Sequence, residues 1–321
     1  MSIVVFSFYG DLGARVLEGL LAQGEEVLGV VARLDPRRPD YEPPIARAAF
    51  SRYVPVYRPA DVNDPAFVEA MRRLRPDYIV SMYSGRLFRE PLLAVPRVGC
   101  VNMHNSLLPR WRGQAPSTWG LIYGDAEAGQ TIHWLDAGTD SGDIIFQRSI
   151  PIEPTDTGGT LGQKLIDMGV GFFLEKWPEI RSGRAPRVRQ DDALATYCAA
   201  PRKRDYVVDW GWPAVRVHNH VRGFGPPGEG AVTHFLGRRV RLLRTEVADA
   251  PPARGDSGVP GQVIAATGDG IVVRTGDGSV AIREARYEDD GSSFLAGPSL
   301  GPWCVLGRGG LPGASGVLGN H

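Results

Sequence analysis

The sequence predicts an α/β fold with a doubly wound, mostly parallel sheet, followed by a small OB-like β-barrel domain. In the first half, short apolar runs rich in β-branched residues alternate with helix-like segments, which is typical of βαβ units. After residue 186, brief strand-like runs are separated by Gly and Pro, as in small barrels. The 321 residues, 43% of them hydrophobic, are enough for two domains with cores of their own.

The elements of the first domain follow one another along residues 1–190. Short apolar runs predict strands at 3–8, 27–32, 54–57, 78–82, 99–104, 130–135 and 144–150. Helical periodicity predicts helices at 12–21, 65–74, 115–123 and 160–180. Ligands of such sheets bind outside the carboxyl ends of the strands, so the segments 81–87, 102–109 and 136–143 are candidate parts of one site.

The second domain is predicted to span residues 203–300. A helix is expected at 214–222, and strands are expected at 239–243, 261–265, 270–273 and 280–285. The remaining segment, 301–321, is Gly-rich and low in charge, and we expect it to be a disordered tail.

Charge and cysteine usage limit the classes of partner. The 36 basic and 36 acidic residues cancel, so no bulk field attracts a polyanion or a membrane surface, although a local basic patch stays open. The chain starts with a strand-like run and has no window long enough to span a membrane, so we expect a cytoplasmic protein. Cys100, Cys198 and Cys304 are widely separated and odd in number, which favours reduced thiols over disulfides or a metal site.

The segment 101–143 carries the residues best suited to chemistry. Asn102 and His104 are two apart on a predicted strand, so both side chains point to the same face of the sheet. An imidazole can move a proton to or from an amine, and an amide can stabilise an oxyanion on an attacked carbonyl. Asp140, in a Gly-rich loop, is the candidate carboxylate that would orient the imidazole and raise its pKa.

Each of these residues also has a structural interpretation. A single strand-end histidine is most often an ordinary hydrogen-bonded residue, and Asp-Gly loops are most often solvated turns. Asp143 is interpreted as a turn or capping residue, and His133 as a packing residue within its strand. His218 and His220 have no third ligand at a suitable spacing, so no metal site is predicted.

The combined pattern resembles the 10-formyltetrahydrofolate-dependent formyltransferase family. The matching motifs are residues 102–109 (NMHNSLLP), 112–113 (RG), 115–116 (AP), 129–133 (GQTIH) and 136–143 (DAGTDSGD), and the likeness covers nearly the whole chain. The resemblance implies a catalytic triad of Asn102, His104 and Asp140, a formyl donor 10-formyltetrahydrofolate, and a cis bond before Pro109. It also implies that the folate is held by two segments, Arg86, Leu87 and Phe88 in one and Asp136, Ala137, Gly138 and Thr139 in the other.

Within the family, the chain looks most like the amino-sugar formyltransferases. The basic insertion of the tRNA enzymes is shortened here to residues 34–44, so we expect a small-molecule amine such as a nucleotide-linked amino sugar and no nucleic-acid or membrane partner. The acceptor pocket is expected to include Tyr83, Arg112 and Gln114. Gln114 and Asn105 depart from the pattern of the aminoarabinose enzymes, which keeps two alternatives open: first a hydroxyornithine acceptor of siderophore synthesis, then methionyl-tRNA.

Two further classes of protein stay open at this stage. A hydrolase that releases formate from the same folate would share the triad, and a folate- or nucleotide-binding protein would need no catalysis. The sequence does not fix the oligomeric state, and a homodimer is left open.

Overall fold

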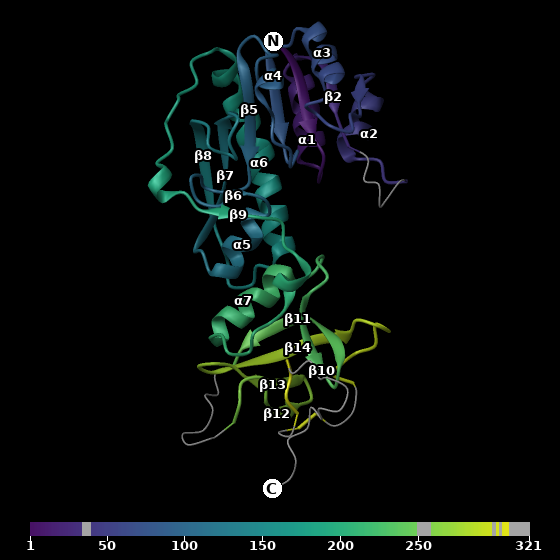
Figure 1. Cartoon of the computed structure of the whole chain (residues 1–321), viewed down its shortest axis with the longest axis vertical. Coiled ribbons are helices and arrows are strands. Elements are labelled where there is room, and N and C mark those ends of the chain that lie inside the picture. The colour runs from purple at the N-terminus through teal and green to yellow at the C-terminus, as the bar shows by residue number, and fades with distance from the viewer. Residues whose placement is uncertain (34–39, 249–257, 297–299, 302–303, 308–321) are drawn as a thin grey trace. The chain divides into compact units, whose positions relative to one another are not determined.

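The computed structural model describes residues 1–33, 40–248, 258–296, 300–301 and 304–307. The chain forms two compact units (Figure 1). Unit 1 comprises Met1–Pro116, Glu127–Pro151 and Gln163–Ala199, and unit 2 comprises Ser117–Ala126, Ile152–Gly162 and Ala200–His321. The predicted division between residues 190 and 203 stays a prediction. Most of the predicted disordered tail, 301–321, lies outside the described residues, as does most of the shortened insertion at 34–44.

Unit 1 is built on a seven-stranded sheet with the order β3-β2-β1-β4-β5-β7-β8. The first five strands in this order are parallel, β7 is antiparallel to β5, and β8 is antiparallel to β7. The predicted fold class is therefore confirmed. The strands are β1 (Ser2–Ser7), β2 (Glu26–Val31), β3 (Val56–Tyr57), β4 (Tyr78–Met82), β5 (Gly99–His104), β7 (Glu127–Trp134) and β8 (Ile144–Pro151).

Helices cover both faces of this sheet (Figure 1). One apolar layer joins the sheet to α1 (Leu12–Ala22), α2 (Pro44–Ser51) and α6 (Gly158–Arg181), and a second joins it to α3 (Pro65–Leu74) and α4 (Glu90–Leu93). The start of α3 follows from the sequence, because the Asp64 carboxylate accepts the N–H groups of Ala66 and Phe67. The helices α2 and α4 were not predicted; α2 starts on the pair Pro43-Pro44, and α4, with four residues, is too short for a helical period.

Two very short strands connect distant parts of unit 1. The strand β6 (Arg112–Gly113) pairs in parallel with β9 (Tyr197–Cys198). Neither was predicted, because two residues carry no periodic signal. Their pairing ties the segment that follows β5 to the segment that follows α6.

Unit 2 contains a five-stranded antiparallel sheet with the order β10-β11-β14-β13-β12. The helix α7 (Ala214–Phe224) buries Val217 and Val221 against this sheet, and the predicted helix at 214–222 is confirmed. His220 is 3% exposed, with its ring beside Trp212 and Phe224. The strands are β10 (Ala231–Phe235), which was not predicted, β11 (Arg238–Val247), β12 (Val263–Thr267), β13 (Gly270–Arg274) and β14 (Ser279–Tyr287), and α5 (Pro116–Tyr123) lies in this unit from Ser117 on.

Two other predictions concern membrane-spanning helices and the state of the cysteines. In the part of the chain that the structure describes, no helix has both the length and the apolar composition needed to cross a membrane. All three cysteines are free.

Candidate active site

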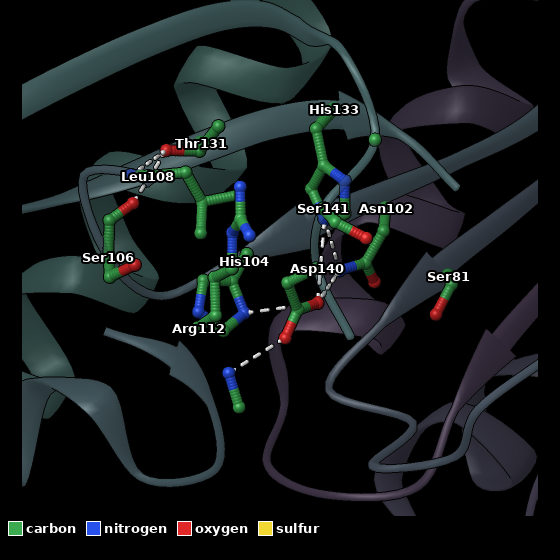
Figure 2. A network of polar contacts seen from close by, with 12 residues as sticks. Ser81, Asn102, His104, Ser106, Leu108, Arg112, Thr131, His133, Asp140 and Ser141 are labelled. Atoms are coloured by element: carbon green, nitrogen blue, oxygen red, sulfur yellow. Dashed lines mark hydrogen bonds and ion pairs between the residues drawn. The ribbon is translucent and has the colours of Figure 1, made fainter. Parts of the chain in front are cut away.

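The strand β5 places Asn102 and His104 on the same face of the unit 1 sheet. Their neighbours are fixed by the strand register: Ser81 of β4 lies beside Asn102 on one side, and His133 of β7 lies beside it on the other. Both side chains are almost completely buried, Asn102 at 8% and His104 at 6% exposed. The pairing of β5 with β7 therefore adds a second imidazole to the pair that the sequence indicated (Figure 2).

The loop between β7 and β8 brings Asp140 to these side chains. One carboxylate oxygen, Oδ1, lies 3.5 Å from His104 Nδ1 and 3.5 Å from Asn102 Nδ2. The other, Oδ2, accepts the backbone N–H of Gly113 at 2.9 Å. Asp140 has a left-handed backbone with φ of +50°, a conformation that costs energy for a non-glycine residue and persists only where its surroundings impose it.

The loop is shaped by its own contacts on either side of Asp140. The Asp136 carboxylate accepts the Gly138 N–H at 3.1 Å and the Ser141 hydroxyl at 3.0 Å. Gly142 packs so closely on β7 that a Cβ there would lie 1.9 Å from the carbonyl oxygen of Trp134, so only glycine fits. The residues 136–139 stay exposed, which leaves their backbone accessible to a ligand.

The hydrogen bonds of His104 identify the nitrogen that exchanges a proton. Its Nε2 lies 2.9 Å from the carbonyl oxygen of Trp111, which can only accept, so Nε2 carries a hydrogen. The proton that comes and goes is then on Nδ1, which faces the Asp140 carboxylate.

The same reasoning shows which ring nitrogen of His133 carries the hydrogen. Its Nδ1 donates to the Trp134 carbonyl oxygen at 2.9 Å, so in the neutral ring Nε2 is an acceptor, and it receives an N–H of Asn102 at 3.0 Å. His133 thereby fixes the orientation of the Asn102 amide. The distance from Asn102 Nδ2 to Asp140 Oδ1 is 3.5 Å, so the second N–H of Asn102 makes no strong hydrogen bond to Asp140. The sequence interpretation of His133 as a packing residue missed this contact, because only the strand register reveals it.

The protonation states follow from burial and charge. Burial lowers the pKa of His104 below 6.5, and the Asp140 carboxylate opposes that shift. Burial raises the pKa of Asp140, but the Gly113 N–H and the cationic forms of the neighbouring His104 and His133 rings lower it to about 2. At neutral pH the site therefore holds an ionised carboxylate beside a neutral imidazole that is ready to accept a proton.

The turn after β5 has the predicted cis peptide bond, between Leu108 and Pro109. Thr131 of β7 holds this turn, since its hydroxyl donates to the Ser106 carbonyl oxygen at 2.6 Å and accepts the Leu108 N–H at 3.1 Å (Figure 2).

The segment that contains Arg86, Leu87 and Phe88 follows β4. Arg86 and Leu87 are exposed, whereas Phe88 is buried with its ring centroid 4.9 Å from that of Phe6. Asn63 holds the backbone, because its amide donates to the Leu87 carbonyl oxygen and accepts the Arg89 N–H. The segment thus has an anchored side chain and an exposed backbone, as a ligand-binding loop needs.

The three residues expected in the acceptor pocket have different surroundings. The Tyr83 hydroxyl accepts the Gln130 amide at 3.0 Å, and burial raises the pKa of Tyr83 to about 12. Gln114 is exposed, and its backbone N–H donates to the Cys198 carbonyl oxygen. Arg112 is only 1% exposed, and its guanidinium pairs with Asp192 and Gln190 inside unit 1.

Among the residues that the structure describes, no group of three or more His, Cys, Asp or Glu side chains could hold a metal ion. The arrangement of amide, imidazole and carboxylate suits a proton transfer beside an attacked carbonyl.

Two family models match this chain. The model described as formyl transferase matches residues 2–176, and the model described as formyl transferase, C-terminal domain, matches residues 202–297. The chain is 37% identical to the methionyl-tRNA formyltransferase of Geobacter sulfurreducens over 96% of its own length and 97% of that protein. It is 34% identical to the corresponding enzyme of Geotalea uraniireducens, over 95% and 98% of the two chains.

Solved structures of low sequence identity share the fold. The sugar 3N-formyl transferase WlaRD, solved with dTDP and 5-N-formyl-THF, has a TM-score of 0.68 at 15% identity, covering 90% of this chain and 98% of WlaRD. HypX from Aquifex aeolicus, solved with tetrahydrofolic acid, has a TM-score of 0.61 at 19% identity, covering 91% of this chain and 45% of HypX.

These comparisons correct two expectations. The small-molecule amine acceptor is wrong, and so is the expectation of no nucleic-acid partner, because the relatives that match almost the whole chain at 34–37% identity are methionyl-tRNA formyltransferases. The likeness to amino-sugar enzymes is a likeness of fold at 15% identity. The expectation failed because a neutral net charge averages over the whole chain, whereas nucleic acid is recognised by a local surface.

Proposed function

The chain belongs to the formyl transferase family and is an N-formyltransferase, and from this premise we propose that it transfers the formyl group of 10-formyltetrahydrofolate to the α-amine of methionyl-tRNA. The observation that carries the proposal is the 37% sequence identity to a methionyl-tRNA formyltransferase over almost the full length of both chains. A folate co-substrate agrees with the folates bound in structures of the same fold.

In this proposal, Asn102 stabilises the negative charge that develops on the formyl oxygen, and His104 takes up the proton that the attacking amine loses. The amine nitrogen attacks the formyl carbon, a C–N bond forms, and negative charge develops on the formyl oxygen. The Asn102 N–H that His133 does not use donates to this oxygen. His104 Nδ1 takes the proton that the attacking nitrogen loses, and the bond between the formyl carbon and N10 of the folate then breaks as N10 receives that proton.

Asp140 stabilises the His104 cation that exists between these two proton transfers. Its low pKa of about 2 keeps it ionised throughout the working pH range, and its Oδ1 faces the nitrogen that changes its protonation state. A neutral His104 in the resting enzyme can accept the proton, so the lowered pKa of this buried histidine fits the role of a base.

The folate is assigned to the two loops beside the triad. The backbone of Arg86, Leu87 and Phe88 and that of the exposed residues 136–139 offer hydrogen-bonding groups to a planar ring system. The Phe88 side chain in the core and Asn63 hold the first loop in place, which limits the entropy lost on binding.

The acceptor assignment agrees with arginines on unit 2. Six arginines lie on the neighbouring strands β11 and β14, with Arg241 directly opposite Arg286. Arg244 and Arg286 are exposed, whereas the other four are each ion-paired with a neighbouring carboxylate: Arg238 with Asp289, Arg239 and Arg241 with Glu288, and Arg283 with Glu246. Phosphates of an RNA are bound by such cations, so formylation of a tRNA is expected to weaken as salt rises.

The experiment that tests the function is a comparison of acceptors. Purified protein is supplied with 10-formyltetrahydrofolate and either initiator methionyl-tRNA, free methionine or a dTDP-linked amino sugar, and the formylated product is measured by mass. We expect product from methionyl-tRNA alone, with a KM for the tRNA that rises with salt concentration. Formylation of the amino sugar without formylation of methionyl-tRNA would refute the proposal.

A further inference from the structure

Gln190 lies in the extended segment between α6 and β9, far along the chain from the triad. Its side-chain Nε2 donates to two backbone carbonyl oxygens of the Asp140 loop, that of Asp140 at 2.8 Å and that of Gly142 at 2.7 Å. Both hydrogens of this amide are therefore used on the loop, one on each side of Ser141. Gln190 is 5% exposed, so water does not compete for these bonds.

The other end of the Gln190 amide is held by Arg112. Its Oε1 accepts Arg112 Nε at 3.0 Å and Nη2 at 2.9 Å. A guanidinium only donates and a carbonyl only accepts, so the orientation of the Gln190 amide between them is unambiguous. Arg112 is fixed in turn, because Nη2 also donates to Asp192 at 2.8 Å and Nη1 donates to the Tyr197 hydroxyl at 2.8 Å.

These contacts reach Asp140 from two directions. Gln190 holds its backbone, and Gly113, the residue after Arg112, donates its N–H to the Asp140 carboxylate. The left-handed φ of +50° at Asp140 needs such external support, since an unrestrained aspartate would relax toward an ordinary conformation. Relaxation would carry the carboxylate away from His104 Nδ1.

We propose that Gln190 is a positioning residue for formyl transfer, which holds Asp140 beside His104, and that Arg112 acts through Gln190 and not on the acceptor. This inference rests on the proposed roles of Asp140 and His104. It assigns a task to a residue outside every motif that indicated the site, and it gives the buried Arg112 a partner that explains its burial.

The test removes the two donors and keeps the size of the side chain, as in Gln190→Met. The matched control is Gln23→Met. Gln23 is exposed at the C-terminal end of α1, and its side-chain amide donates a similar bond to the backbone oxygen of Leu174 in α6. We expect Gln190→Met to lower kcat by about tenfold to hundredfold with little change in KM, as for a misplaced catalytic group, and Gln23→Met to leave both unchanged.

A second measurement does not depend on activity. Asp140 and His133 are the titratable groups that act on His104, so loss of Asp140 from its place should lower the pKa of His104, measured by NMR of its ring proton. The six histidines make assignment practical, with His104→Gln identifying the signal. Failure of the wild type to formylate methionyl-tRNA would refute the proposed function, whereas this titration still decides the positioning role.

The inference is overturned if Gln190→Met keeps kcat within threefold and leaves the His104 titration unchanged. It is also overturned if Gln190→Met lowers kcat by the same factor in an Asp140→Asn background, because its effect would then not act through the carboxylate. If Gln190→Met does not fold, Gln190→Glu replaces it, since a glutamate keeps the Arg112 contact and loses both donors.

Discussion

The charge of Asp140 is the part of the site whose contribution is easiest to isolate. Asp140→Asn keeps the size of the side chain and an oxygen that can accept the Gly113 N–H, but it removes the negative charge beside His104 Nδ1. We expect the enzyme to fold, to bind its substrates and to transfer the formyl group slowly.

The distance between the Asp140 carboxylate and His104 Nδ1 determines how much kcat should fall. At 3.5 Å between Asp140 Oδ1 and His104 Nδ1, with an effective dielectric constant of about 20, the charge stabilises an imidazolium by about 5 kcal/mol. If the proton is fully on His104 in the transition state, kcat falls by roughly 3,000-fold, and if it is half transferred, kcat falls by roughly 50-fold. The loss of kcat therefore lies between these two limits.

The assay is steady-state formylation of methionyl-tRNA between pH 5 and 9. Without the carboxylate, the pKa of His104 falls further below 6.5, so the acidic limb of kcat/KM moves to lower pH as the maximum rate drops. The matched control is Asp143→Asn, which makes the same change of charge in the same loop at a residue assigned to no role in the transfer. An Asp140→Asn enzyme within threefold of wild type, or one with an unmoved acidic limb, would refute the role of the charge.

Three further predictions concern single side chains. Asn102→Ala should lower kcat by about 10²- to 10³-fold through loss of the oxyanion donor, and a rise in KM with unchanged kcat would contradict this. His133→Leu should lower kcat by about tenfold to hundredfold, because the Asn102 amide loses the acceptor that orients it; an unchanged thermal midpoint together with full activity would exclude that role. Burial lowers the pKa of His220 from 6.5 to about 4, so its contribution to stability is present above pH 6.5 and is lost as the pH falls toward 4, by roughly 3 kcal/mol. Chemical unfolding of the wild type and His220→Phe, followed by tryptophan fluorescence, should show this pH dependence in the wild type and a flatter curve in the variant.

Regular elements with a clear period were predictable from the sequence. The helix α1 repeats Leu12, Val16 and Leu20 on one face, and the apolar runs of β1, β4 and β5 are the buried parallel strands that their composition indicates. Most of the elements that were missed are very short, such as β6 and β9, or start on prolines, such as α2, although the five-residue strand β10 was missed as well. Two residues of β-structure are set by the partner strand and leave no local pattern.

The prediction of a small-molecule acceptor was wrong partly because it relied on the net charge of the whole chain. The equal numbers of acidic and basic residues and the shortened insertion favoured a small molecule, and the relatives overturned that expectation. A net charge sums over every surface, whereas nucleic acid is bound by individual exposed cations, such as Arg244 and Arg286 on the adjacent strands β11 and β14. Strand pairing, which brings Arg241 opposite Arg286, is not visible in the composition.

The sequence by itself determined the two-part α/β and antiparallel architecture, and it put Asn102 and His104 on one strand face, because side-chain direction along a strand follows from local geometry. Only the tertiary structure decided what surrounds them. The antiparallel pairing of β7 with β5 brings in His133, and hydrogen bonds across long stretches of chain bring Asp140, Arg112 and Gln190 together. These contacts depend on packing and strand register, which arise from interactions between segments distant in sequence and so leave no spacing to read.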